Sequence, residues 1–257
     1  MKLLWLIFYC LSFGYLCLAV FALVAANKMT FPVPNVSYTK NSFPLVELSL
    51  SSGSKAYATY LPNENAKYTL LYCHGNAEDL GTIYPHLTNL QRCGFAVLAF
   101  DYPGYGLSPG KPSERGCFDA AEAAFKYLTE NLRIKNESIM LYGRSLGSGS
   151  ALHIASREPV AGVILNGAFT STFRTITRYK ILPWDNFDNL ALIDQITCPV
   201  LFIHGKQDVT VPFYHSEQLY NRIQGEKFKL WVESAGHNDL MEHAHDDYWK
   251  ALQDFVD

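Results

Sequence analysis

The sequence predicts one α/β domain: a mostly parallel, twisted sheet with helices on both faces and a short cap insert. Two observations lead to this expectation. Short apolar runs alternate with stretches of helical spacing along most of the 257 residues, a pattern typical of parallel strands that crossover helices cover on both faces. One run also passes through a Gly-rich turn directly into a helical stretch. Functional sites in such sheets lie at the carboxyl ends of the strands.

The expected strands begin with Pro44–Leu50 and Lys55–Pro62, which alternate apolar and polar side chains and predict an antiparallel pair with one face in water. Six continuous apolar runs follow, and we expect them to pair in parallel, covered on both faces. These runs are Tyr68–Gly75, Phe95–Gly104, Ser138–Ser145, Val160–Ala168, Cys198–Asp208 and Lys227–His237. Between them, Ser113–Arg133 has the clearest helical spacing, with Ser113 as the expected N-cap.

The amino terminus differs from the rest of the chain. Leu3–Ala26 carries no charge and is long enough to cross a bilayer as a helix. We therefore expect residues 1–28 to form a single-pass membrane anchor, residues 29–43 an extended linker and residues 44–257 the α/β domain. A signal peptide is the alternative, and its cleavage would give a secreted protein, although its apolar region is usually shorter, about 7 to 15 residues.

Composition excludes several classes of function. The formal net charge is −3 with both signs scattered along the chain, so no basic face favours nucleic acid. The six cysteines are widely spaced, without a C-x-x-C pair or a zinc-like pattern, and are expected to be buried free thiols. We expect no metal and no organic cofactor. The sequence leaves the oligomeric state open.

The Gly-rich turn has the form Gly-x-Ser-x-Gly, with Ser145 between Gly143 and Gly147. No lysine follows the glycines as a phosphate loop would require, and the dinucleotide-binding pattern is absent as well. In the Gly-x-Ser-x-Gly motif, a strained strand-to-helix turn lifts the serine above the sheet, and side chains two residues before and after it would clash. The motif predicts a nucleophile at Ser145; the alternative role is a helix cap.

Asp208 and His237 complete a candidate catalytic triad with Ser145. Each follows one of the later apolar runs, and the chain order Ser, Asp, His is the one expected of this strand-to-helix serine motif. His237 is the predicted base that takes the serine proton, and Asp208 is predicted to hold the imidazole in the required tautomer. The structural alternatives are an Asx turn at Asp208 and a loop histidine at His237.

Two main-chain N–H groups are candidates for an oxyanion hole. Asn76 follows the run Tyr68–Gly75 just before a helix, and Leu146 follows the predicted nucleophile. Donors in these two places stabilise the negative charge that develops on an acyl oxygen, with one donor worth about 2.7 to 4 kcal/mol. We expect the backbone of Asn76, not its side chain, to serve this role.

Five segments together resemble the α/β-hydrolase superfamily, and within it the membrane-attached serine hydrolases that include α/β-hydrolase domain-containing protein 17, a family of protein depalmitoylases. The segments are "TLLYCHGNAEDLG", "FDYPGYGLSPGKPSE", "IMLYGRSLGSGSALHIAS", "CPVLFIHGKQDVTVPFYHS" and "LWVESAGHNDL". The resemblance implies nucleophile Ser145, acid Asp208, base His237 and oxyanion donors Asn76 and Leu146. The residue patterns lead independently to the same set.

The only sizeable insert over the predicted site lies between Ala168 and Ile196. A short cap of this kind would suit an acyl chain, with core packing as the alternative. Its predicted pocket residues are aromatic: Phe169, Phe173, Trp184 and Phe187. The sequence thus predicts a membrane-anchored serine hydrolase that acts on a lipidic or acylated substrate, an ester or thioester, without a cofactor. A peptidase or amidase of the same fold and a non-catalytic ligand-binding module are the alternatives.

Overall fold

The computed structural model describes residues 1–256; residue 257 and the side chains of residues 25–27 lie outside the described part. Its strands form one sheet in the order β1-β2-β4-β3-β5-β6-β7-β8. The strands are β1 Val46–Ser49, β2 Lys55–Leu61, β3 Thr69–Cys73, β4 Ala96–Phe100, β5 Ile139–Arg144, β6 Gly162–Asn166, β7 Val200–Gly205 and β8 Lys227–Val232. The pairs β1–β2 and β2–β4 are antiparallel, and every later pair is parallel. The predicted mostly parallel sheet is confirmed.

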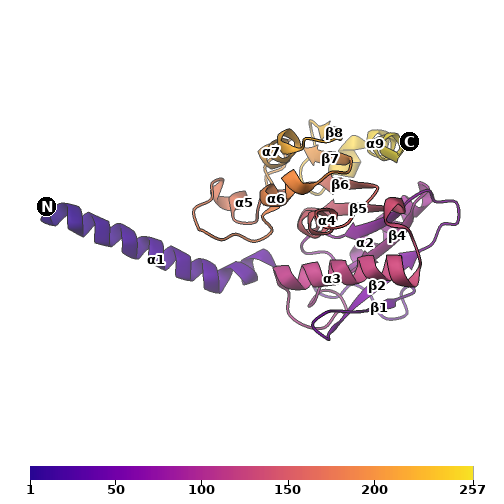
Figure 1. Cartoon of the computed structure of the whole chain (residues 1–257), viewed down its shortest axis with the longest axis horizontal. Helices are drawn as coiled ribbons and strands as arrows, with labels where there is room; N and C mark the ends of the chain where they lie inside the picture. The colour runs from indigo at the N-terminus through magenta and orange to yellow at the C-terminus, as the bar shows by residue number, and fades with distance from the viewer. Residues whose placement is uncertain (257) are drawn as a thin grey trace.

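Helices cover both faces of the sheet, as the sequence predicts (Figure 1). The α-helices are α1 Lys2–Thr30, α2 Leu80–Arg92, α3 Glu114–Lys126, α4 Gly147–Ala155, α5 Arg174–Thr177, α6 Asn189–Leu192, α7 Tyr214–Arg222, α8 Leu240–Ala244 and α9 Asp246–Val256. A π-helical turn, η1 (Tyr127–Asn131), continues α3, and two 3₁₀ turns are η2 (Asn136–Ser138) and η3 (Ile193–Gln195).

Alternation along the strands divides the core into two layers. In β3, Leu71 and Cys73 join the cluster that contains the apolar faces of α3 and α4. Leu70 and Tyr72 of the same strand point to the opposite face and join the cluster with α2 and α9. Because successive side chains of a strand point to opposite faces, one continuous apolar run supplies both layers.

Two local predictions can be compared directly with the structure. Ser113 caps α3, where its hydroxyl accepts a hydrogen bond from the Gly116 N–H at 3.1 Å. The run Lys227–His237 does contain a strand parallel to β7, but two side chains of β8, Phe228 and Lys229, are exposed, so the strand is not covered on both faces. β8 lies at the end of the sheet order, and an edge strand with charged side chains such as Lys229 resists pairing with another chain.

The amino-terminal helix α1 projects away from the α/β body (Figure 1). Lys2–Val24 is long and apolar enough to cross a membrane, and none of this stretch is buried inside the protein. Of the segment 29–43, predicted as an extended linker, Met29 and Thr30 belong to α1, and residues 31–43 contain no helix or strand. It packs on the domain: Phe31 and Tyr38 are buried, and the Tyr38 hydroxyl donates a hydrogen bond to Asp101 at 2.5 Å. α1 is therefore joined to the body by a segment that is itself held in place.

Candidate active site

Ser145 occupies a sharp turn between β5 and α4. Its φ is +49°, a left-handed conformation that is unusual for a residue other than glycine and that marks local strain. A Cβ atom at Gly143 would lie 2.6 Å from Cα of Ser148, and one at Gly147 would lie 2.0 Å from the Cys73 carbonyl oxygen. The glycines therefore allow the close backbone approach that holds the serine hydroxyl above the end of the sheet.

The structure brings Ser145, His237 and Asp208 together. His237 Nε2 lies 3.0 Å from Ser145 Oγ, and His237 Nδ1 lies 2.6 Å from an oxygen of Asp208. Ser145 follows β5, Asp208 follows β7 and His237 follows β8, so the carboxyl ends of three parallel strands at one edge of the sheet supply all three side chains. The order of contacts matches the Ser–His–Asp arrangement in which an imidazole accepts a serine proton while a carboxylate orients it.

The carboxylate of Asp208 is held ionised by several donors. Burial opposes its ionisation, but hydrogen bonds from His204, His237 and the Val211 N–H outweigh burial and keep the pKa of Asp208 well below its ordinary value. His204 is a residue that the sequence analysis missed. It is fully buried, and its Nε2 lies 3.2 Å from Asp208 and 2.8 Å from the Val211 carbonyl oxygen. Its only sequence signal is its position four residues before Asp208.

The predicted oxyanion loop is anchored by an ion pair that the sequence did not reveal. Arg144 Nη1 lies 2.5 Å from Glu78, and the other carboxylate oxygen of Glu78 accepts the Gly75 N–H at 2.6 Å. Arg144 directly precedes Ser145, so this pair joins the nucleophile turn to the loop that carries Asn76. Both Asn76 and Leu146 line the same cavity as Ser145, so the two predicted oxyanion donors and the predicted nucleophile border one space.

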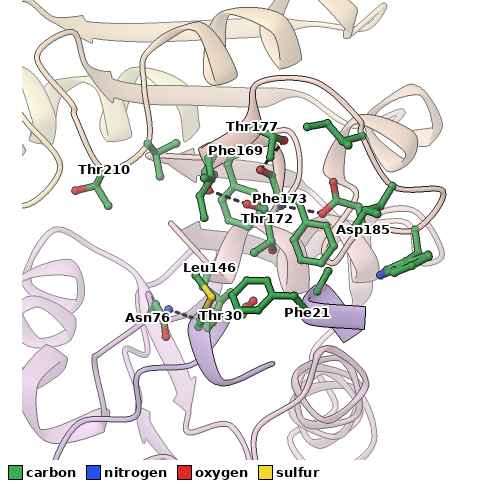
Figure 2. Close-up of a pocket in the computed structure, with 18 of the residues that line it drawn as sticks. Phe21, Thr30, Asn76, Leu146, Phe169, Thr172, Phe173, Thr177, Asp185 and Thr210 are labelled. Carbon is green, nitrogen blue, oxygen red and sulfur yellow. Dashed lines mark hydrogen bonds between the residues drawn. The ribbon is translucent and has the colours of Figure 1, made fainter. Parts of the chain in front are cut away.

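A cavity of about 480 Å³ opens in front of Ser145, and its lining is mostly apolar. Three of the four predicted pocket residues, Phe169, Phe173 and Trp184, line it. In Figure 2, Phe169 and Phe173 lie across the cavity from Asn76 and Leu146. The lining also includes side chains of α1, such as Phe21, which the sequence analysis assigned only to an anchor. The cavity is therefore built from the sheet, the cap insert and the amino-terminal helix together.

Phe187, the fourth predicted pocket residue, does not line this cavity. Its side chain is fully buried and packs edge-on against the rings of Phe31 and Phe118. A Cβ atom at Gly149 would lie 2.3 Å from the Phe187 ring, so the ring fills the space over α4. The prediction was wrong because aromatic composition does not show which way a cap residue points; this one turns inward to the core.

A second, smaller cavity of about 180 Å³ is lined in part by His237. Its lining is more polar and includes Glu78, Arg144, Asn166 and Asn238. His237 therefore lines a polar cavity that is large enough for water and contacts Ser145, which lines the apolar one. Among residues 1–256, no group of three or more His, Cys, Asp or Glu side chains is arranged to hold a metal ion.

The sheet order, with a serine on the turn after β5, is the architecture of the α/β hydrolases, a class of hydrolytic enzymes. Residues 68–179 match the family model described as alpha/beta hydrolase fold. The chain is 40% identical over 195 residues to alpha/beta hydrolase domain-containing protein 17B of Homo sapiens, a match that covers 75% of this chain and 67% of that protein. It is 38% identical to protein 17C of Mus musculus, covering 75% and 60%. The chain belongs to the α/β-hydrolase family, as a relative of domain-containing protein 17.

Solved structures show the same fold at low sequence identity. An esterase from Pyrococcus furiosus superposes with a TM-score of 0.74 at 21% identity, covering 88% of this chain and 98% of that one. Alpha/beta hydrolase domain-containing protein 10 from mouse superposes with a TM-score of 0.63 at 18% identity, covering 82% and 98%. The fold is therefore shared well beyond the relatives that sequence identity detects.

Proposed function

We propose that this chain is a membrane-anchored serine hydrolase that cleaves acyl esters or thioesters through an acyl-enzyme intermediate. The observation that carries the proposal is the pair of contacts of His237, at 3.0 Å from Ser145 Oγ and 2.6 Å from Asp208, beside a mostly apolar cavity. The membership in a hydrolase family supports the reaction class. The acylated substrate is what the resemblance to the membrane-attached serine hydrolases implies. Acyl-protein thioesterase activity is the specific form of this proposal.

In the proposed mechanism, His237 Nε2 takes the proton of Ser145 as the serine oxygen attacks the acyl carbonyl carbon. The N–H groups of Asn76 and Leu146 stabilise the oxyanion of the tetrahedral intermediate. The intermediate collapses as His237 returns the proton to the leaving alcohol or thiol, and Ser145 keeps the acyl group. Water then attacks the acyl-enzyme with His237 again as base, which releases a carboxylic acid. Asp208 stays ionised and stabilises the imidazolium in both halves.

The cavity favours an acyl chain over a polar side chain. Phe169, Phe173 and Trp184 supply aromatic surface on one side, and Leu146 supplies aliphatic surface near Ser145. Burying apolar surface of a ligand contributes roughly 25 cal/mol per Å², so each added methylene that fits should strengthen binding. A peptidase or amidase built on the same triad would need polar partners for the peptide on either side of the scissile bond, and this apolar lining favours the acyl ester reading.

The test is hydrolysis of matched esters, thioesters and amides of increasing acyl length by the full chain in detergent, beside its Ser145→Ala form. We expect a preference for long acyl chains in wild type. Loss of the nucleophile should lower kcat about 10⁶-fold, in the range found when a catalytic serine is removed. Equal circular dichroism spectra and melting temperatures of the two forms would show that the fold is retained.

Three results would contradict the proposal. Turnover that persists in Ser145→Ala would refute the assignment of the nucleophile. Failure of wild type to react with an active-serine phosphonate probe, together with tight binding of a fatty acid, would favour the non-catalytic ligand-binding alternative. Faster cleavage of aminoacyl amides than of esters would favour the peptidase or amidase alternative.

A further inference from the structure

The helix α1 supplies part of the wall of the cavity in front of Ser145. Leu18, Phe21 and Ala22 line the cavity from α1, and Met29 does so from the last turn of the same helix. The first three are spaced i, i+3 and i+4, so they lie on one face of the helix. Figure 2 shows Phe21 beside Leu146 and below Phe173, with its ring toward the cavity. One face of the predicted anchor is thus directed at the site.

Two hydrogen bonds hold α1 against the rest of the site. The side-chain amide of Asn76 donates to the Thr30 carbonyl oxygen at 2.5 Å, and its own oxygen accepts the Tyr105 hydroxyl at 2.6 Å. Further along the helix, the Tyr15 hydroxyl donates to the Ile181 carbonyl oxygen at 3.3 Å. The carboxyl end of α1 is therefore tied to the residue proposed as an oxyanion donor, and its middle is tied to the cap insert.

The residues that form this wall also belong to the stretch that can span a membrane. That stretch is Lys2–Val24, so Leu18, Phe21 and Ala22 occupy its last two turns. In a bilayer, these turns lie close to the boundary between acyl chains and headgroups, because a span of this length matches the apolar core. The cavity wall and the lipid boundary are then the same piece of helix.

The cap insert beside α1 exposes apolar side chains in the same region. Ile176, Tyr179 and Ile181 are 75%, 70% and 47% exposed, and the two basic residues among them are Arg178 and Lys180. Apolar and aromatic side chains mixed with basic ones are typical of segments that lie in a membrane interface. The contact of Tyr15 with Ile181 places this part of the insert alongside the membrane-spanning stretch.

From these contacts we propose that α1 is part of the substrate site: the acyl chain of a membrane-borne ester or thioester enters from the bilayer and lies between α1 and residues 173–184. This inference rests on the proposed function and adds to it the route and the binding surface of the acyl chain. The anchor then has two roles, because it holds the enzyme at the membrane and it completes the pocket that selects long acyl chains.

The test compares two tryptophan substitutions in the full chain, reconstituted in phosphatidylcholine vesicles. Ala22→Trp fills the cavity from the α1 side. The control, Val24→Trp, places the same ring two residues away. Val24 is 78% exposed and does not line the cavity. We expect Ala22→Trp to lower kcat/KM for a palmitoyl thioester at least tenfold and to change kcat/KM for an acetyl thioester less than twofold. Val24→Trp should leave both values within twofold of wild type.

Equal activity of Ala22→Trp and Val24→Trp on the palmitoyl substrate would overturn this inference. It would leave the proposed function standing, provided that the activity disappears in Ser145→Ala. An equal loss on the acetyl and palmitoyl substrates would also overturn it, because such a loss reports a damaged site and not a shortened pocket.

A second measurement does not depend on turnover. A palmitate analogue with a mid-chain diazirine is photolysed with the full chain in detergent, and labelled peptides are identified by mass spectrometry. In wild type, we expect labelling of residues 173–184 that excess palmitate suppresses. The same labelling should persist in Val24→Trp and fall at least fivefold in Ala22→Trp. If wild type hydrolyses no ester, the proposed function fails, and this labelling alone decides whether α1 borders an acyl site. Equal labelling of this segment in both variants would refute the inference.

Discussion

At Ser145 the main chain is strained, and the surrounding hydrogen bonds show what holds it in place. The Ser145 N–H donates to the Asn166 carbonyl oxygen at 2.8 Å, and its carbonyl oxygen accepts the Ser148 N–H at 2.9 Å. A single residue in a left-handed conformation costs on the order of 1 to 3 kcal/mol and persists only where its surroundings impose it. Here the strain keeps the hydroxyl within 3.0 Å of His237, ready for proton transfer in the proposed reaction.

Asp101 is a second buried acid near the site, and it sits in a different environment from Asp208. It accepts the Leu80 N–H at 2.9 Å and the Tyr38 hydroxyl at 2.5 Å, and His74 Nε2 lies 3.5 Å from it. Burial raises the pKa of Asp101 to about 7, and its hydrogen bonds offset only part of that effect. Burial likewise lowers the pKa of His74, so its imidazole favours the neutral form.

This pKa predicts a pH dependence of stability. A carboxyl group that titrates near 7 in the folded chain and near 3.9 in the unfolded chain binds more protons when folded between these values. Its contribution to the free energy of unfolding is therefore full below about pH 4 and falls as the pH rises toward 7. Asp101→Asn cannot titrate at this position. As the pH rises from 5 to 7, we therefore expect the free energy of unfolding of wild type to fall by on the order of 2 kcal/mol relative to that of Asp101→Asn.

The measurement is the free energy of unfolding in urea of both full-length proteins in the same detergent, at several pH values. The difference between the two free energies of unfolding isolates the contribution of Asp101, because the other titrating groups are common to both proteins. A difference that stays constant from pH 5 to pH 7, or that changes in favour of wild type, would contradict the raised pKa.

At the scale of elements, the turn from β5 to α4 depends on close backbone packing. A side chain at Gly147 would meet the Cys73 carbonyl at the end of β3, and backbone atoms there have no way to move aside. Overpacking costs typically 1 to 3 kcal/mol and occasionally more. We expect the loss in free energy of unfolding caused by Gly147→Ala to lie at or above the top of that range. The same change should lower Tm by about 6 °C or more.

Gly225→Ala is the matched control in this experiment. Its nearest neighbour would be the Thr197 carbonyl oxygen at 3.8 Å, an ordinary van der Waals distance. Its free energy of unfolding should stay within about 0.5 kcal/mol of wild type. Circular dichroism melts of both variants provide the comparison. A Gly147→Ala protein as stable as the Gly225→Ala protein would show that the turn tolerates a side chain.

The strands and the clearest helix are the elements that sequence predicts best. Their signals are local: alternation or continuity of apolar residues for β1 to β7, and a cap with one apolar stripe for α3. The exposure of β8 was missed because an apolar run does not tell whether a further strand or helix covers it. The π-helical turn η1 at the end of α3 also left no recognisable signal.

At the scale of the whole molecule, the arrangement of α1 and the body decides how the enzyme would meet its substrate. The body is compactly packed around one sheet, whereas the apolar stretch Lys2–Val24 of α1, long enough to cross a membrane, projects from it (Figure 1). From Tyr15 onward α1 contacts the cap insert and borders the cavity, and Phe31 follows it into the core. A bilayer around Lys2–Val24 would thus lie next to the cavity.

We expect the full chain to remain in the membrane pellet after extraction with carbonate at pH 11, as a membrane-spanning helix requires. Leu11→Arg places a charge in the middle of the apolar stretch, at a cost of about 2.5 to 3.5 kcal/mol, and should increase the released fraction. Val24→Arg, at the end of the stretch, should release far less.

The mass of the mature protein distinguishes the anchor from a signal peptide. An intact amino terminus supports the anchor, whereas a mass that lacks the first 24 to 28 residues, the segment covered by α1 up to its last turns, would indicate cleavage. Recovery of the wild-type chain in the carbonate supernatant would contradict membrane spanning.

The sequence by itself determined the fold class, the order of the strands' apolar runs and the set Ser145, Asp208 and His237. These features rest on patterns that are local in the chain, and on a chain order that the topology of parallel strands converts into proximity. Contacts between distant segments required the tertiary structure, because no local pattern encodes them. They include the hydrogen bond of His204 to Asp208, the Glu78–Arg144 pair and the inward turn of Phe187. The same holds for the wall that α1 adds to the cavity, since an apolar helix has the same composition whether it faces lipid alone or a substrate as well.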